Sequence, residues 1–178
     1  TGRDTCITSA GGFTGPQFKM TTPSWQQSAV DMYLSQTGPG VFGAFPTKDN
    51  APSFNPSGRG YPDVAALGWG QMLMGPDGEP AFPVSGTSLA APIVASLFTL
   101  ANQKLKSEGY DTIGYANPML YWMGESCPQA FNDVVFGNNT QNGFGSFDVQ
   151  CDIGYPATPG WDAASGWGSI NFIPFVDC

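Results

Sequence analysis

The segment 88–107 constrains the fold of this chain more than any other part of the sequence. Apolar residues cover nearly every face of its N-terminal half, which is typical of a helix packed on all sides. Pro92 falls in the first turn, where its missing N–H costs little. Lys104 and Lys106 lie in the last turn, where they complement the helix dipole, and Gly109 follows as a stop signal. The segment therefore predicts a deeply buried helix.

The residues at the start of this helix read Val-Ser-Gly-Thr-Ser at 84–88. A helix N-terminus presents unpaired N–H groups and a partial positive charge, so a serine there can attack a substrate while the amides stabilise the oxyanion. Ser and Thr are also preferred N-caps, and the local pattern alone favours capping by Ser85, Thr87 or Ser88. The chain contains no histidine, so a serine nucleophile in it needs another kind of base.

Composition narrows the class of protein. The 178 residues suffice for one domain with a core. Only 11% of them are charged, the net charge is −8 and no Lys/Arg cluster occurs, which argues against a nucleic-acid partner. Few ionisable groups and an acidic balance suit a protein that works at low pH. The sequence has no apolar run long enough for a membrane span and no signal-peptide pattern, so we expect a mature, processed secretory chain.

The four cysteines fit two disulfides in an oxidising compartment: Cys6, Cys127, Cys151 and Cys178. Three connectivities are possible, and the sequence does not choose among them. Metal-ligand spacing is absent, which argues against zinc. Asn138-Asn139-Thr140 is a glycosylation sequon. Together these features predict a secreted protein or one in an acidic lysosome- or vacuole-like compartment.

Other segments carry local signals of secondary structure. From Phe131 onward the pattern becomes irregular and rich in Gly, Asn and Asp, and it ends in a short apolar tail at 170–176. Before that point we expect a strand over 5–10, a helix over 23–37 with Ser24 as N-cap, a buried strand within 60–67, a hairpin pairing 69–74 with 81–84 around Pro76-Asp77-Gly78, and a helix from Asn117-Pro118.

The pattern Gly86-Thr87-Ser88-x-x-x-Pro92 resembles the serine motif shared by subtilisins and sedolisins, the latter being serine-carboxyl peptidases. The absence of histidine argues against a subtilisin. The resemblance to sedolisins runs from about residue 5 to the end of the chain. Its remaining segments follow the sedolisin order: SWQQSAVDMYL at 24–34, GRGYPDVAALG at 58–68, Asn-Pro-x-Leu-Tyr at 117–121, Phe-Asn-Asp-Val at 131–134, Gly-Trp-Asp at 160–162 and Gly-Trp-Gly at 166–168.

The resemblance implies an α/β fold, with a subtilisin-like parallel sheet flanked by helices. Residues 1–178 would be the C-terminal part of the peptidase domain, completed by a partner chain. It also implies that Ser88 is the nucleophile, with a glutamate as base, an aspartate that orients it and a further aspartate at the oxyanion. A carboxyl base suits acid pH. In sedolisins these carboxylates precede the region that matches residue 5, so we expect a second polypeptide to carry them.

The carboxylates within this chain do not replace the missing ones. Asp4, Asp31 and Asp49 do not lie in matching contexts. Asp63 matches a family position, and we interpret it as structural. Glu79 lies in the hairpin before Ser88, where a glutamate in a turn is expected to be solvated.

The resemblance also implies a calcium site in the loops at about 131–168. Asp133 and Asp162 would give side-chain oxygens, and Val134 and Gly160 would give main-chain carbonyls. A further carbonyl comes from a glycine in the family, and Thr158 stands there in this chain. Calcium accepts such mixed oxygen sets. Without the resemblance, the two aspartates would be interpreted as turn caps.

Two functions follow. The first is an acid-acting peptidase, either an endopeptidase or a tripeptidyl-peptidase, that cleaves peptides or proteins through an acyl-enzyme on Ser88. The alternative is a non-catalytic, calcium-stabilised secreted domain derived from a peptidase and used for binding or structure. Retention of Ser88 in its full Gly-Thr-Ser context favours the first.

Overall fold

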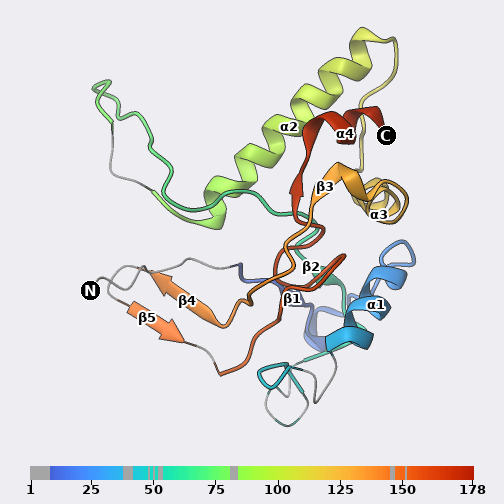
Figure 1. Ribbon diagram of the computed structural model, residues 1–178, viewed down its shortest axis with the longest axis vertical. Helices are drawn as coiled ribbons and strands as arrows, with labels where there is room; N and C mark the ends of the chain where they lie inside the picture. The colour runs from blue at the N-terminus through green and yellow to red at the C-terminus, as the bar shows by residue number, and fades with distance from the viewer. Residues whose placement is uncertain are drawn as a thin grey trace.

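The structure is a computed structural model that describes residues 9–37, 42–47, 49, 51, 54–80, 84–144, 147–150 and 152–178, with the backbone alone for 141–144 and 147–150. Long helix α2 stands along one side of the molecule, with α4 beside it (Figure 1). The elements in chain order are β1 (Gly12–Phe13), η1 (Pro16–Phe18), α1 (Gln27–Thr37), β2 (Gly60–Tyr61), α2 (Thr87–Ser107), α3 (Asn117–Ser126), η2 (Pro128–Ala130), β3 (Phe131–Asn132), β4 (Gln141–Phe144), β5 (Phe147–Gln150), β6 (Ser169–Ile170) and α4 (Phe172–Asp177).

The strands form three two-stranded antiparallel sheets, β1–β2, β3–β6 and β4–β5. The expected parallel sheet is not present within the described ranges, where parallel pairing is limited to the isolated bridge between Ala65 and Ser169. A parallel strand needs a neighbour that arrives through a long crossover. Among the described residues, segment 60–67 finds Phe13 and Ser169 beside it but no such crossover strand.

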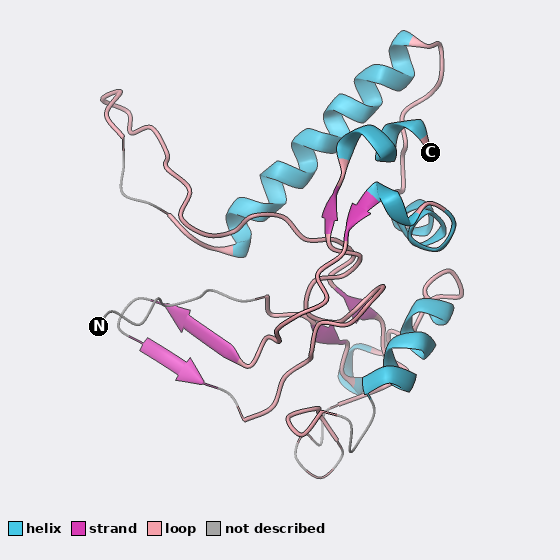
Figure 2. Cartoon of the chain, viewed as in Figure 1, coloured by secondary structure: helices cyan, strands magenta, loops and turns pink. Residues whose placement is uncertain are grey.

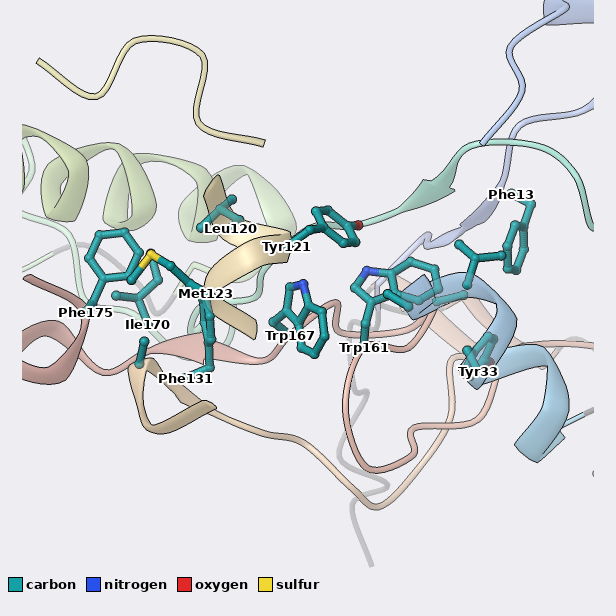
Figure 3. Close-up of a cluster of buried hydrophobic side chains, with 14 of the residues drawn as sticks. Phe13, Tyr33, Leu120, Tyr121, Met123, Phe131, Trp161, Trp167, Ile170 and Phe175 are labelled. Atoms are coloured by element: carbon teal, nitrogen blue, oxygen red, sulfur yellow. The ribbon is translucent and has the colours of Figure 1, made fainter. Parts of the chain in front are cut away.

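The core is aromatic and centres on the C-terminal loop, whose residues from Trp161 to Gly168 are all buried. The Trp167 ring packs edge-on against Tyr121 at a centroid distance of 5.9 Å and stacks on Phe131 at 6.3 Å. Trp161 meets Tyr33 at 5.6 Å. Figure 3 shows these rings as one continuous row that joins α1, α3 and the C-terminal segments. The loop therefore holds the separate helices together.

Glycines allow this loop to approach neighbouring backbone. Gly166 has φ of +63° and Gly168 has φ of +84°, which L side chains rarely adopt. A Cβ on Gly166 would clash with the carbonyl of Asp63, and one on Gly168 would clash with the carbonyl of Asn132. The Gly-Trp-Gly motif thus places a large ring between two positions where only hydrogen fits.

Helix α1 confirms the predicted helix but begins later than expected. Residues 23–26 form a turn, so Ser24 is not the N-cap, and its carbonyl accepts a hydrogen bond from Gln27 N at 3.4 Å. Gln26 is fully buried and donates to Gly60 O at 2.8 Å while its Oε1 accepts from Gly60 N at 3.0 Å. The buried side-chain amide of Gln26 pairs with both the carbonyl and the N–H of Gly60 in β2. This pairing explains why α1 begins only after Gln26.

Helix α2 has nearly the predicted bounds, but the expectation of deep burial is wrong for this chain. Ala101 is the only α2 residue that is buried among the described residues, and Leu100 is 49% exposed. Helix α4 covers one face, where Phe98 meets Phe175 at a centroid distance of 5.7 Å. Val94 and Leu97 are also partly buried against the core, but much of the α2 surface has no helix or strand beside it within the described residues (Figure 2). Its apolar faces lack a partner surface in this part of the sequence.

Of the other elements expected from the sequence, one helix and one hairpin are confirmed. Helix α3 begins at Asn117 as predicted, and the hairpin pairs Gln71 with Val84 and Met74 with Pro80, although 81–83 lie outside the described residues. The strand expected over 5–10 falls almost entirely outside them too. The β4–β5 hairpin was missed. None of the helices in the described ranges has the length and apolar character that crossing a bilayer requires.

A disulfide joins Cys127, which follows α3, to the C-terminal Cys178. This bond shows which cysteine pairs with Cys127, a choice that the sequence left open. Cys6 and Cys151 lie outside the described residues. The bond ties α4 and α3 together at the end of the core, because both flank the cysteines directly.

Candidate active site

The start of α2 is built on a glycine. Gly86 is the N-cap, with φ of +154°, and it carries no side chain that could bond to the helix. Its N–H donates to Gly68 O at 2.6 Å, and its carbonyl accepts from Leu89 N at 3.0 Å. The chain thus turns sharply from the hairpin into α2, and Thr87 and Ser88 become the first two helical residues.

Ser88 is exposed, and its hydroxyl has no hydrogen-bond partner in the part of the chain that the structure describes. The hydroxyl of Ser85 instead accepts a hydrogen bond from Gly70 N at 2.9 Å, within the hairpin. The capping interpretation of Ser85, Thr87 and Ser88 is therefore wrong, because no side chain caps this helix. Ser88 stands in the first turn, beside backbone N–H groups that helical geometry leaves unpaired.

A groove of about 810 Å³ begins at this helix start. Along α2 it is lined mainly by small apolar side chains, and the facing wall is formed by the segment 62–66 together with the loop 134–139. The α2 positions on the groove are Thr87, Ala90, Ala91, Val94, Ala95 and Phe98. Gly86 and Thr87, which directly precede Ser88, also line it, and an open, largely apolar groove can hold an extended peptide or a further segment of protein.

Carboxylates from this chain do not reach Ser88 by hydrogen bonds in the described ranges. Glu79 is exposed, and its hairpin projects away from the body of the molecule (Figure 1). Asp31 and Asp49 are exposed as well, and Asp4 lies outside the described residues. Asp63 lines the groove but is engaged elsewhere. Of these carboxylates, the four that the structure describes are not hydrogen-bonded to Ser88.

Asp63 joins the segment around β2 to α3, as its structural interpretation predicts. Its carboxylate forms an ion pair with Arg59 at 2.5 Å and accepts hydrogen bonds from Asn117 Nδ2 at 2.8 Å and from the Tyr121 hydroxyl at 2.9 Å. Burial, reinforced by the negative charge of Asp63, raises the pKa of Tyr121 well above its ordinary range. Sequence reasoning missed Asn117 and Tyr121, although their i, i+4 spacing places both on one face of α3.

Asp162 is the centre of the second candidate site and is fully buried. Its Oδ1 accepts hydrogen bonds from Ala164 N at 2.9 Å and from Ser165 N at 2.7 Å, and its Oδ2 accepts one from Thr158 N at 3.2 Å. Burial raises the pKa of Asp162 to about 6 in spite of these bonds. Asp162 therefore caps its turn, and its charge is still poorly compensated by the groups around it.

The other residues expected to bind calcium meet Asp162 in the same loops. Asp133 Oδ2 accepts a hydrogen bond from Gly160 N at 2.7 Å. The main-chain carbonyls of Val134, Thr158 and Gly160 accept no hydrogen bond within the described residues. Thr158 Oγ1 is buried and also lacks a partner there. Hydrogen bonds thus link Asp133 to Gly160 and Thr158 to Asp162, and Val134 is the chain neighbour of Asp133. Several of their oxygens have no partner among the described residues, and carbonyl and carboxylate oxygens are the ligands that calcium takes.

Carboxylates alone would not make such a site. Within the residues that the structure describes, no group of three or more His, Cys, Asp or Glu side chains is placed to hold a metal. An ion between Asp133 and Asp162 would depend on main-chain carbonyls for the rest of its coordination. That is the ligand composition expected for calcium rather than for a transition metal.

Comparison with known proteins finds relatives along most of the chain. Tripeptidyl-peptidase sed1 from Aspergillus fumigatus is 32% identical over 179 residues, which cover 97% of this chain and 25% of the relative. Physarolisin from Physarum polycephalum is 33% identical over 167 residues, covering 93% and 26%. Human tripeptidyl-peptidase 1 is 32% identical over 176 residues, covering 92% and 26%. The chain thus spans about a quarter of the length of these relatives. No protein-family model matches it.

A solved structure agrees with these relatives. Pseudomonas sedolisin, a serine-carboxyl proteinase solved with two molecules of pseudo-iodotyrostatin, matches with a TM-score of 0.60 at 28% identity. The match covers 94% of this chain and 35% of that chain. It supports a peptidase α/β fold of which the described elements are one part.

Proposed function

Because this chain belongs to the sedolisin family of serine-carboxyl peptidases, we propose that it supplies the nucleophile of an acid-acting peptidase, and that this nucleophile is Ser88. One observation carries the proposal. The Ser88 side chain is exposed in the first turn of α2 and has no hydrogen-bond partner among the described residues, and the two residues before it, Gly86 and Thr87, line the apolar groove. A serine that served only as a cap would be bonded to the helix.

The chemistry follows from this position. Ser88 Oγ bonds to the carbonyl carbon of the scissile peptide and passes its proton to a carboxylate base, and the amine then leaves with a proton. Water hydrolyses the resulting ester and restores the hydroxyl. Unpaired N–H groups at the start of α2 stabilise the oxyanion that forms in both steps. A carboxylate is a suitable base at acid pH, where imidazole would be protonated.

The base belongs, in this proposal, to a second polypeptide that carries the catalytic glutamate and aspartates. One feature supports such a partner. The apolar face of α2 is open, and an open apolar face is usually covered by another protein surface. The partner would lie against the groove wall formed by Ala91, Val94 and Ala95.

A calcium ion fits the second site. The carboxylates of Asp133 and Asp162 and the carbonyls of Val134, Thr158 and Gly160 would hold it, and the carbonyls accept no hydrogen bond within the described residues. When bound, the ion supplies positive charge to a buried carboxylate and fixes the loop. Asp162 meanwhile orders the turn at 162–165, and this turn positions the core tryptophans Trp161 and Trp167.

We place the protein in a secreted or acidic lysosome- or vacuole-like compartment. The Cys127–Cys178 disulfide supports an oxidising route. The low content of charged residues, 11% of the chain, suits an acidic destination, because fewer carboxylates then lose native interactions on protonation.

Labelling tests the nucleophile. The full native protein is treated with a fluorophosphonate at about pH 4, where a carboxylate base is active, and the modified peptide is identified by mass spectrometry. We expect modification at Ser88, with labelling and peptide hydrolysis lost in Ser88→Ala and retained in the matched variant Ser96→Ala on the same helix. A native assembly that is folded but unlabelled would instead support the non-catalytic binding or structural domain.

A comparison of native and denaturing conditions tests the partner. Intact-mass and gel analysis should show a native species larger than this chain and, after denaturation, a second polypeptide. A monomeric, folded and active species of about 19 kDa would contradict the proposal.

A further inference from the structure

The loop between β3 and β4 carries a feature that the peptidase chemistry does not use. Phe136 is 88% exposed, more than any other large apolar side chain of the described residues, and Asn138 two positions later is also exposed. Both residues line the groove, and their exposure places them on its rim rather than its floor. Asn138 belongs to the Asn-Asn-Thr sequon at 138–140.

The loop is firmly held around these exposed side chains. Asn139 Nδ2 donates to Gly11 O at 3.1 Å, and its Oδ1 accepts from Tyr155 N at 2.7 Å. The backbone of the loop pairs with the segment 155–157, through Asn139 N to Tyr155 O at 3.1 Å and Ala157 N to Gly137 O at 2.9 Å. Anchored on both sides, the loop presents Asn138 outward in one conformation.

The sequon side chains are already paired with each other. Asn138 Oδ1 accepts hydrogen bonds from Thr140 Oγ1 at 2.6 Å and from Thr140 N at 3.1 Å. Its amide nitrogen Nδ2 has no partner in the described ranges. The carboxamide is thus held by its oxygen while its nitrogen is free, which is the end that a modification would use.

We propose that Asn138 carries an N-linked oligosaccharide whose first sugar packs on the Phe136 ring. In the transfer, Asn138 Nδ2 forms a bond to the anomeric carbon of a lipid-linked oligosaccharide, the bond to the lipid diphosphate breaks, and Nδ2 gives up one proton to the transferase. This inference depends on the secretory route proposed above. The folded loop accommodates the product, since Asn138 is exposed and its Nδ2 has no hydrogen-bond partner among the described residues.

The exposed ring of Phe136 offers a surface on which the first sugar at Asn138 would pack. Two peptide units separate it from Asn138, so their Cα atoms lie at most about 7 Å apart, within reach of the first sugar. The electron-rich face of an aromatic ring attracts the C–H groups of a sugar. Packing of the sugar would cover apolar surface that the chain itself leaves open, and would therefore stabilise the glycosylated loop.

Site occupancy is measured first. The full-length protein, secreted by a eukaryotic host, is digested and treated with peptide-N-glycosidase in H₂¹⁸O, which converts a glycosylated asparagine to labelled aspartate. We expect the label at Asn138 and not at Asn142, which has no Ser or Thr two residues later. Thr140→Ala should abolish it and Thr140→Ser should retain it.

Two negative outcomes have different meanings. Unmodified Asn138 in protein whose Cys127–Cys178 bond is formed would overturn this inference and leave the secretory proposal intact. Unmodified Asn138 together with reduced cysteines would overturn both.

The role of Phe136 needs a separate measurement. The midpoint of thermal unfolding is recorded before and after enzymatic deglycosylation, in wild type, in Phe136→Ala and in Phe18→Ala, another exposed phenylalanine. We expect deglycosylation to lower the midpoint by about 2–4 °C in wild type and Phe18→Ala, and to have little effect in Phe136→Ala. An equal loss in all three would overturn the packing of the sugar on Phe136.

Discussion

Helix α2 and the loop Trp161–Gly168 reverse the usual relation between sequence and burial. The helix is the most continuously apolar segment, yet Ala101 is its only buried residue among the described ones. The loop has three glycines in the stretch 160–168 and includes an aspartate and a serine, yet every residue from 161 to 168 is buried. Apolar character therefore does not decide burial in this chain.

The difference lies in where the partner surfaces are. The loop is enclosed by α1, α3 and β3, which all belong to the described residues, and within it the Asp162 carboxylate accepts hydrogen bonds from Ala164 and Ser165. The second surface for α2 is not among them. We infer that the loop stabilises this chain by itself, whereas α2 stabilises an assembly. Substitutions in the two regions should separate these roles.

The largest effect should come from the centre of the core. Trp161→Ala in chain 1–178 removes a ring that packs on Tyr33, Phe13 and Tyr121, and we expect it to lower the free energy of unfolding by about 3–5 kcal/mol. Urea unfolding measures the change. Trp122→Ala, at a position that is 56% exposed on α3, is the matched control and should cost far less. Equal losses would show that the aromatic row is not the core.

The second-largest loss of stability should come from the hydrogen-bond network around Asp63. Asp63→Ala removes the acceptor of Arg59, Asn117 and Tyr121 together, and we expect a loss of about 2–3 kcal/mol because half-buried donors are left unpaired. The control is Asp111→Ala, which breaks the exposed pair with Lys106 and should change nothing measurable. Urea unfolding of both variants decides whether the Asp63 network contributes more than a surface pair.

Overpacking at α3 should have a somewhat smaller effect. A Cβ on Gly124 would clash with the Trp167 ring, so Gly124→Ala should cost about 1–3 kcal/mol, although alanine favours the helix. At Gly43 the added methyl meets nothing within 4 Å, and Gly43→Ala should be close to neutral. Thermal unfolding of the pair checks the result. A stabilised Gly124→Ala would mean that the loop moves freely against α3.

The smallest effect in chain 1–178 should come from a substitution in α2. This substitution tests directly whether α2 and the buried loop differ in what they stabilise. Leu100 is 49% exposed, so Leu100→Ala in chain 1–178 should change the free energy of unfolding by no more than about 0.5 kcal/mol. In the full protein, where the proposed partner covers α2, the same change should cost about 2–5 kcal/mol. Urea unfolding of both forms gives the comparison, and equal small effects would contradict a covering partner.

Local signals sufficed for several parts of the fold and site. The bounds of α2, the start of α3 and the hairpin before Ser88 follow from apolar period, proline position and a Pro-Asp-Gly turn, all of which act within a few residues. Among the residues expected at the calcium site, hydrogen bonds join Asp133 to Gly160 and Thr158 to Asp162, and calcium binding itself stays a prediction. The β4–β5 hairpin was missed, since its Gly- and Asn-rich strands show no alternation.

Other features depended on contacts between distant residues. The start of α1 was displaced because Gln26 pairs with Gly60, 34 residues away, and the cap of α2 moved to Gly86, whose backbone angle no serine adopts readily. The sequence by itself determined the family and the helix that begins beside Ser88, because both follow from patterns of residues close together in the chain. Only the tertiary structure decided which apolar surfaces are covered, since burial requires a second surface and α2 finds little of one within this chain.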